Sequence, residues 1–267
     1  MTPANQQPNA FVHRLDDEGA QAYLRRRPSY PSGVIEALGL GAPGGGASDQ
    51  QPGKRLRAVD IGAGTGKFTQ LLAAAPFEVT ALDPSPAMRE TLHAQPWAAA
   101  EGVRVTDGSA EATGLESSEY DLVTWAQCFH WLDADAAVAE AARILRPGGT
   151  AAVIYNQLDT TKPWVHRLTR IMRSGDVLER QPAPDLGPLF ASPKRTVIEW
   201  TDRQSPEEVL ELARTRSSYL NASKTGREKL QSNLRWYLYD RLGFFEGEPI
   251  ELPYRTTVWA ARSVPAA

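Results

Sequence analysis

The sequence contains little that would support disulfide, metal, membrane or nucleic-acid chemistry. Among 267 residues Cys128 is the only cysteine, so no internal disulfide can form. The four histidines are too scattered to give the spacing of a zinc site, and we predict no metal. No apolar run reaches the roughly 18 residues that a membrane-spanning helix requires. Acidic residues outnumber Lys and Arg by 32 to 29, which leaves no basic field for a nucleic-acid backbone.

The first ten residues are mostly polar and lack the apolar stretch of a signal peptide. We therefore expect a cytoplasmic protein, monomeric or homodimeric, whose partner is a small molecule rather than nucleic acid or a membrane. A hydrophobic content of 42% is enough for one substantial core with a cap over it.

A glycine-rich segment is the most informative part of the sequence. The apolar stretch that begins at Ala58 leads through Asp60 into glycines at 62, 64 and 66, and the next apolar stretch ends at Asp83. A strand, a glycine turn, a helix and a second strand ending in an acid together bind nucleoside-containing ligands at the edge of an α/β sheet. Glycines let the backbone approach such a ligand. Asp83 occupies the place where ribose hydroxyls would lie.

Several cofactor classes use a glycine turn, and the spacing distinguishes them. A P-loop requires Gly-x-x-x-x-Gly-Lys-Ser/Thr, but Lys67 precedes Phe68, and Ile61 replaces the first glycine. A dinucleotide site prefers Gly-x-Gly-x-x-Gly, whereas here every second residue is glycine. Asp60 would repel a pyrophosphate but would suit the ammonium of an amino acid. The segment resembles motif I of the class I methyltransferases, which favours S-adenosylmethionine over NAD.

Apolar and helical patterns alternate along the rest of the chain. Strands are predicted at 103–107, 120–126 and 150–155, with a helix at 134–145 before the last of them. After residue 160 we expect helices at 163–172, 205–219 and about 226–242, and strands at 194–201 and 253–261. Residues 1–10 are predicted to be disordered, and 39–53 and 181–193 to be loops. This alternation indicates a parallel sheet with helices on both faces.

The order of these motifs resembles that of small-molecule methyltransferases of the trans-aconitate and ubiquinone/menaquinone-biosynthesis type. The resemblance covers about residues 56–156 and includes Ser109-Ala-Glu111, Gln127-x-x-His130-Trp131 and Leu145-Arg-Pro-Gly-Gly149. The Arg26-Arg-Pro-Ser-Tyr-Pro31 segment is similar to an element that covers the cofactor in trans-aconitate-like members. The resemblance implies an α/β fold, namely a Rossmann-like, doubly wound, seven-stranded sheet that is mostly parallel with an antiparallel last strand, plus a helical lid.

We divide the chain accordingly into an N-terminal lid segment with a loop (1–55), a core that binds S-adenosylmethionine (56–160), and a helical lid with the C-terminal strands of the same domain (161–267). The predicted cofactor-binding residues are Tyr30, Asp60, Gly62, Ala63, Gly64, Gly66, Asp83, Ser109, Ala110, Glu111 and Gln127.

The sequence indicates fewer catalytic residues than cofactor-binding residues. His130 follows the fourth strand at the carboxyl edge of the sheet, where a general base would lie beside the methyl group. It would equally serve as a packing residue. Trp131 is a candidate for stacking on the acceptor or for filling the core. In the lid, Arg214, Arg216 and Tyr219 would bind an anionic acceptor, although helical arginines are commonly solvated.

We therefore predict an S-adenosylmethionine-dependent methyltransferase that acts on an oxygen or carbon nucleophile of a small organic acceptor, in particular a carboxylate, and releases S-adenosylhomocysteine. One alternative is an NAD-dependent oxidoreductase, for which no catalytic Tyr/Lys pair is found. Another is a non-catalytic partner protein that binds S-adenosylmethionine.

Overall fold

The computed structural model describes residues 16–40, 55–173 and 183–264. One seven-stranded sheet runs through the molecule in the order β3-β2-β1-β4-β5-β7-β6. The strands are β1 (Leu56–Ile61), β2 (Phe77–Leu82), β3 (Arg104–Thr106), β4 (Tyr120–Ala126), β5 (Leu145–Leu158), β6 (Lys194–Gln204) and β7 (Ile250–Arg262). The five strands from β3 to β5 are parallel, and β7 pairs antiparallel with both β5 and β6. The predicted mostly parallel, doubly wound sheet is confirmed.

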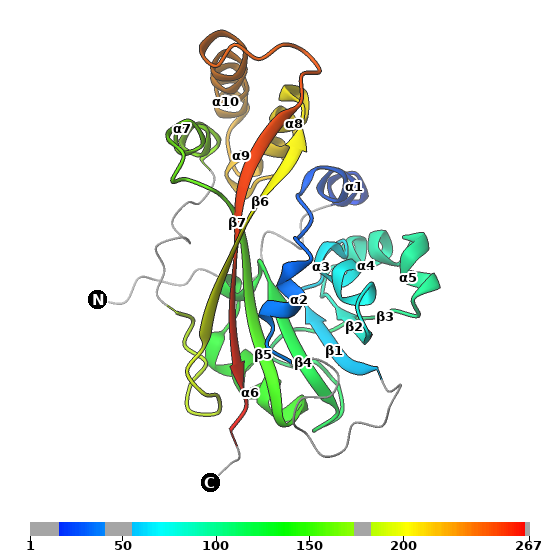
Figure 1. Cartoon of the computed structure of the whole chain (residues 1–267). Coiled ribbons are helices and arrows are strands. Elements are labelled where there is room, and N and C mark those ends of the chain that lie inside the picture. The colour runs from blue at the N-terminus through cyan, green and yellow to red at the C-terminus, as the bar shows by residue number, and fades with distance from the viewer. Residues whose placement is uncertain (1–15, 41–54, 174–182, 265–267) are drawn as a thin grey trace, which may run out of the picture.

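Helices cover both faces of this sheet and extend beyond one end of it (Figure 1). Those before β5 are α1 (Asp17–Arg26), α2 (Gly33–Ala37), α3 (Lys67–Ala73), α4 (Pro86–His93), α5 (Pro96–Ala100), the 3₁₀ turn η2 (Phe129–Trp131) and α6 (Ala134–Ile144). Those after it are α7 (Pro163–Met172), α8 (Pro206–Arg214), α9 (Ser217–Leu220), α10 (Lys224–Trp236) and the π-helical turn η4 (Tyr237–Arg241).

The central strands are apolar because helices cover them on both sides. Val59, Leu122 and Val153, from three neighbouring strands, are completely buried. One hydrophobic cluster joins the sheet to α6, and a second joins the other face to α2 and α3. Parallel strands end at a common edge, so the loops after β1, β2 and β4 meet there.

The predicted lid is a separate helical layer built on the far ends of β5, β6 and β7. Helices α7, α8 and α10 and the turn η4 share a hydrophobic cluster with Leu252 and Tyr254 of β7. Helix α8 of the lid begins with a capping box, because the Ser205 side chain accepts from the Glu208 amide and the Glu208 carboxylate accepts from the Ser205 amide. This start was predicted at the correct residue.

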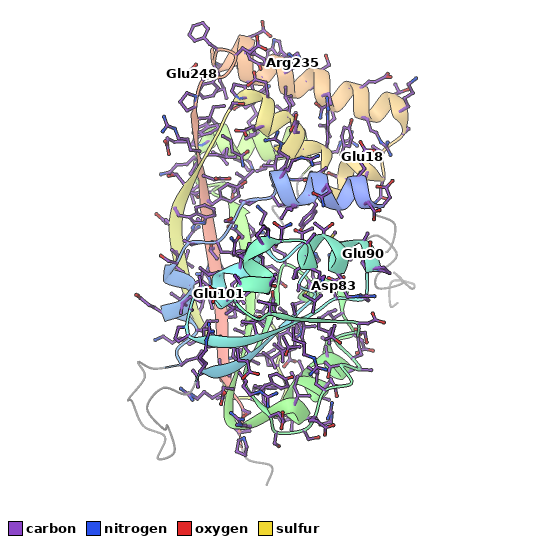
Figure 2. All side chains as sticks on the ribbon, turned by 90° about the vertical axis from the view of Figure 1, so that its right-hand side faces the viewer. Glu18, Asp83, Glu90, Glu101, Arg235 and Glu248 are labelled. Atoms are coloured by element: carbon purple, nitrogen blue, oxygen red, sulfur yellow. The ribbon has the colours of Figure 1, made fainter. Side chains whose placement is uncertain are left out.

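The N-terminal segment lies between core and lid. Figure 2 shows α1, which carries Glu18, below the lid helices and above α4, which carries Glu90, and α1 contacts both α4 and α8. Arg26 forms ion pairs with Glu208 and Glu211 of α8. Pro28 and Pro31 separate α1 from α2, in keeping with the interrupted helical pattern of the sequence.

The structure differs from the predicted elements in two places. The single helix predicted for 205–219 is two helices, because the backbone of Arg216 is extended, with φ −85° and ψ 144°, and α9 begins only at Ser217. Strand β5 starts at Leu145 rather than 150, since the residues of the Arg-Pro-Gly-Gly turn already belong to it. Residues 1–10 and most of 39–53, for which disorder and a loop were predicted, lie outside the described residues. Residues 183–193 form no helix or strand apart from one bridge at Phe190.

Candidate active site

The glycine turn after β1 forms a tight backbone curve beside the end of β2. The amides of Gly62 and Ala63 both donate to the Leu82 carbonyl, at 2.8 and 3.1 Å. Gly62 has φ 70°, and a Cβ there would lie 2.8 Å from the Cys128 sulfur. Gly64 has φ 56°, and a Cβ there would meet no atom within 4 Å. The turn is thus packed on one side and open above Gly64, which fits a ligand lying against the backbone.

Asp83 joins this turn to the end of β2. Its carboxylate accepts from the amides of Gly64 and Ser85, both at 2.8 Å, and the residue is only 3% exposed. In the view of Figure 2 it lies below α1. These two hydrogen bonds orient the carboxylate at the carboxyl edge of the sheet, the position predicted from the sequence.

Asp60 lies beneath the turn rather than on its surface. It is 0% exposed, and its two oxygens accept from the hydroxyls of Thr69, at 2.6 Å, and Thr124, at 3.0 Å. Burial raises the pKa of this carboxyl to about 7, opposed by those two hydrogen bonds. Asp60 has no exposed surface in this structure, and its contact with the ammonium group of the cofactor stays a prediction.

Thr65, between the second and third glycines, was not singled out from the sequence. The residue is 1% exposed, and its hydroxyl has no hydrogen-bond partner among the residues that the structure describes. A buried hydroxyl without a partner is rare in a folded protein. Its position in the turn fits a ligand that supplies the missing bond.

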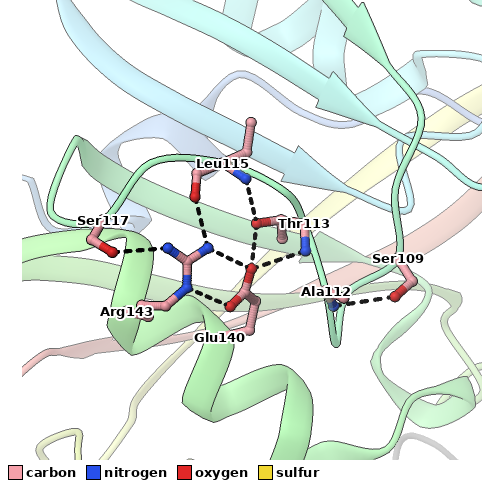
Figure 3. A network of polar contacts seen from close by, with 7 residues as sticks. All are labelled: Ser109, Ala112, Thr113, Leu115, Ser117, Glu140 and Arg143. Atoms are coloured by element: carbon pink, nitrogen blue, oxygen red, sulfur yellow. Dashed lines mark hydrogen bonds and ion pairs between the residues drawn. The ribbon is translucent and has the colours of Figure 1, made fainter.

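The loop after β3 is held by α6 (Figure 3). Glu140 accepts from the amide and hydroxyl of Thr113, at 2.9 and 2.5 Å. Arg143 donates to Glu140, to the Leu115 carbonyl and to the Ser117 hydroxyl. The Arg143 hydrogen bond and those from Thr113 hold the pKa of Glu140 down, to about 2.

The predicted adenine-side residues lie earlier on the same loop. Ala110 is buried, Ser109 accepts from the Ala112 amide, and Glu111 accepts from the Asp133 amide at the start of α6. All three lie on one loop that follows β3, next to Asp83, whose amide donates to the Thr106 carbonyl.

Gln127, at the end of β4, has φ 65°, an unusual value for a residue other than glycine. Its backbone amide donates to the Ile154 carbonyl and its side-chain amide to the Asn156 carbonyl, at 2.9 and 2.5 Å. Strained backbone of this kind concentrates at functional sites. The structure thus supports a special role for Gln127, while its contact with the cofactor stays a prediction.

Asn156 is a further site residue that sequence reasoning missed. Its side-chain nitrogen donates to the Ser29 carbonyl at 2.8 Å, and its oxygen accepts from the Thr256 hydroxyl at 3.0 Å. The N-terminal segment is thereby attached to β5, next to Gln127. Nothing in the sequence marks Asn156, because the contact joins residues 127 positions apart.

Tyr30 follows directly in that segment and packs edge-on against Phe68 of α3, with ring centroids 5.0 Å apart. Burial raises the pKa of its hydroxyl well above the usual value, and the neighbouring charges of Asp60 and Cys128 add to the effect. Tyr30 thus packs on the helix that follows the glycine turn, and its contact with the cofactor stays a prediction.

His130 and Trp131 lie on η2. The His130 ring is 4.8 Å from that of Trp131 and 6.0 Å from that of Tyr155. Burial lowers the pKa of His130, so the imidazole is neutral near pH 7. A neutral imidazole can accept a proton, and its role as base stays a prediction.

The lid candidates are placed differently from one another. Arg214 is exposed in the last turn of α8. Tyr219 faces α10, where the Arg227 guanidinium lies 5.6 Å from its ring centroid. Neither residue has a recorded contact with the glycine turn, and acceptor binding by them stays a prediction.

Within the described ranges no three His, Cys, Asp or Glu side chains are grouped to hold a metal ion. Nor is any helix in that part of the chain both long and apolar enough to cross a bilayer.

Comparisons of the sequence with known proteins identify methyltransferases as its relatives. Residues 59–153 match a family model described as a methyltransferase domain. Over 237 residues the chain is 34% identical to an uncharacterized methyltransferase of Mycobacterium tuberculosis, covering 88% of this chain and 90% of that one. It is 29% identical over 218 residues to an uncharacterized methyltransferase of Schizosaccharomyces pombe, covering 79% and 82%.

Solved structures of methyltransferases are similar to this chain in fold. A protein of Anaeromyxobacter dehalogenans, provisionally assigned as a type II methyltransferase, superposes with a TM-score of 0.55 at 25% identity, covering 90% of this chain and 99% of that one. Phosphoethanolamine N-methyltransferase 2 of Haemonchus contortus, solved in complex with S-adenosyl-L-methionine, shares the fold with a TM-score of 0.50 at 19% identity, covering 98% and 61%.

The chain belongs to the class I methyltransferases, the enzymes that take their methyl group from S-adenosylmethionine.

Proposed function

We propose that this protein transfers the methyl group of S-adenosylmethionine to an oxygen or carbon nucleophile of a small organic acceptor. The observation that carries the proposal is the meeting of three segments at the carboxyl edge of the sheet. These are the open glycine turn at Gly64, the buried carboxylate of Asp83 and the N-terminal segment, in which Tyr30 packs on Phe68 of α3.

Different residues of this edge would bind different parts of the cofactor. Asp83 would accept from the ribose hydroxyls, and Ser109, Ala110 and Glu111 would border the adenine. The turn from Gly62 to Gly66 would carry the amino-acid part, for which the unpartnered hydroxyl of Thr65 is a suitable donor or acceptor. Asp60, from below, favours positive charge at this place when it is ionised.

The reaction itself is an in-line displacement. The acceptor atom bonds to the methyl carbon, the carbon–sulfur bond breaks, and its electron pair stays on sulfur. The protein's contribution is alignment and exclusion of water, supplied here by the N-terminal segment and the lid. An anionic nucleophile needs no base. For a hydroxyl or carbon acid we assign His130 as the base, because its imidazole is neutral and lies beside Tyr155.

Transfer of labelled methyl from S-adenosylmethionine to a panel of carboxylates, phenols and activated carbon acids tests the proposal. We expect labelled product from at least one acceptor class, with an equal amount of S-adenosylhomocysteine. His130→Ala should lower turnover about a hundredfold on a hydroxyl acceptor and leave cofactor affinity unchanged. Near-normal turnover in that variant would show that His130 is a packing residue and not the base.

Tight binding of S-adenosylhomocysteine without turnover on any acceptor would favour the non-catalytic binding protein instead.

A further inference from the structure

A cavity of about 180 Å³ lies between the N-terminal segment, the start of α3 and the end of β6. Its wall consists of residues 25–29, Lys67, residues 202–204 and Glu208 of α8. Lys67 is the first residue of α3 and follows Gly66 directly, so the cavity adjoins the last glycine of the turn. A cavity of this size has room for several water molecules or for the end of a polar ligand.

Cations outnumber acids along the wall of this cavity. Five cationic side chains line it, but only two acids, Asp202 and Glu208. Glu208 pairs with Arg26 at 2.8 Å, and Arg203 lies 3.9 Å from Glu251. Two of the five cations therefore already have acidic partners.

The other three cations, Arg25, Arg27 and Lys67, form no ion pair among the residues that the structure describes. Arg25 is exposed, whereas Arg27 and Lys67 are half-buried. The remaining acid of the wall, Asp202, accepts from the Gln204 side chain at 2.6 Å. Burial lowers the pKa of Lys67, and the charge of Asp202 opposes this effect. The cavity thus has an excess of positive charge that an anionic ligand would offset.

Arg27 is held in place with one donor unused. Its Nη2 donates to the Thr215 carbonyl at 2.9 Å, and its guanidinium lies 4.9 Å from the ring centroid of Tyr23. Its Nε is buried and has no hydrogen-bond partner in the described part of the chain. A buried cationic donor without a partner is costly, so this group favours an anion beside it.

Two residues of the wall connect the cavity to the proposed cofactor edge. Lys67 continues the glycine turn, and the Ser29 carbonyl accepts from Asn156, whose own carbonyl accepts from Gln127 at the end of β4. S-adenosylmethionine has one anionic group, the carboxylate at the end of the amino-acid part that the turn would carry. The anion that the cavity favours is therefore present on the cofactor itself.

We propose that Arg27 and Lys67 bind the amino-acid carboxylate of S-adenosylmethionine. This inference rests on the proposed function and adds the two residues that recognise the charged end of the cofactor. Arg27 donates through Nε and Lys67 through its ammonium group, and the carboxylate offsets the positive charge of the cavity. The cofactor is then held between the N-terminal segment and α3.

Calorimetric titration with two ligands tests this inference. 5′-Methylthioadenosine has the adenosine and the sulfur of S-adenosylhomocysteine but lacks the amino-acid part. Arg27→Gln and Lys67→Gln should each weaken binding of S-adenosylhomocysteine about tenfold or more, and should leave the affinity for 5′-methylthioadenosine within about twofold of the wild-type value.

The second ligand separates recognition from packing. Arg27→Gln also removes the bond to the Thr215 carbonyl, and a merely loosened N-terminal segment would weaken both ligands alike. Lys67 has no recorded hydrogen bond within the described ranges, so Lys67→Gln keeps the test valid if Arg27→Gln folds poorly. Arg235→Gln and Lys229→Gln, matched losses of charge at exposed positions of α10, should bind both ligands as the wild type does.

If either Arg27→Gln or Lys67→Gln, once folded, keeps the wild-type ratio of the two affinities, this inference is overturned and the proposed function stands. Failure of the wild-type protein to bind S-adenosylhomocysteine would instead count against the proposed function.

Discussion

At the scale of single residues, the two acids of the cofactor edge have different environments and so different roles. Asp83 is held by backbone amides at the surface of the turn, whereas Asp60 is enclosed below it between two threonine hydroxyls. Sequence spacing identified both as cofactor residues, but it could not show which side of the turn each occupies.

Asp83→Ala should weaken binding of S-adenosylhomocysteine by about 1 to 3 kcal/mol, because charge-assisted hydrogen bonds to the ribose are lost. Glu90→Ala is the matched control, since it removes an exposed acid from neighbouring α4. Calorimetry on variants with unchanged circular dichroism measures the difference. Equal affinity in the two variants would remove Asp83 from the site.

Asp60 should make the stability of the cofactor-free protein depend on pH. Its carboxyl has a pKa of about 7 when folded and about 3.8 when unfolded, so from pH 4 to 7 the unfolded state has lost a proton that the folded state keeps. Unfolding free energy therefore falls as pH rises through this range and levels off above 7.

Asp60→Asn should remove this slope. Because one pKa unit corresponds to about 1.36 kcal/mol, the unfolding free energy of the variant relative to that of the wild type should rise by up to about 4 kcal/mol between pH 4 and 7. Urea unfolding at a series of pH values provides the test, with Glu90→Gln expected to keep the slope. A constant difference between Asp60→Asn and wild type over that range would contradict the burial of an uncharged Asp60.

At the scale of elements, the loops that would contact the cofactor are positioned by side chains from elsewhere. Helix α6 braces the loop after β3 through Glu140 and Arg143, and β5 holds the N-terminal segment through Asn156. The helix and strand themselves were predictable from apolar periodicity, but these braces were not, because each joins segments that are distant in sequence.

Glu140→Gln should loosen the loop at 109–117, since the charged bonds with Arg143 are lost. We expect faster amide hydrogen exchange there and a loss of about fivefold in S-adenosylhomocysteine affinity. Asp135→Asn, an exposed change in the first turn of the same helix, serves as control. Unchanged exchange in Glu140→Gln would show that the brace is dispensable.

Asn156→Ala should release Ser29 and lower the unfolding free energy by about 1 to 3 kcal/mol, because a buried pair of hydrogen bonds is lost. Hydrogen exchange should quicken at residues 29 and 30, and methyl transfer should slow as water enters the site. Asn233→Ala, exposed on α10, is the comparison. Slow methyl transfer without faster exchange would argue against a covering role for this segment.

At the scale of the whole molecule, the N-terminal segment ties the lid to the core. Arg26 pairs with two acids of α8, Arg27 bonds to the backbone after that helix, and Ser29 is held by β5. This arrangement joins the lid to the sheet through one short stretch of chain, residues 26–29.

Whether a feature of the fold or of the site could be predicted depends on how far apart in the sequence the interacting residues are. The strands of the core and the glycine turn depend on local patterns, and the sequence predicted them. The bonds of Arg27 to the Thr215 carbonyl and of Asn156 to the Ser29 carbonyl depend on tertiary packing between segments 188 and 127 positions apart, which periodicity does not report.

The central claim is that the glycine turn binds S-adenosylmethionine, and side-by-side calorimetry with S-adenosylhomocysteine and NAD tests it most directly. The account predicts binding of S-adenosylhomocysteine with a Kd of about 1 to 100 µM and no binding of NAD. Binding of NAD alone would contradict it.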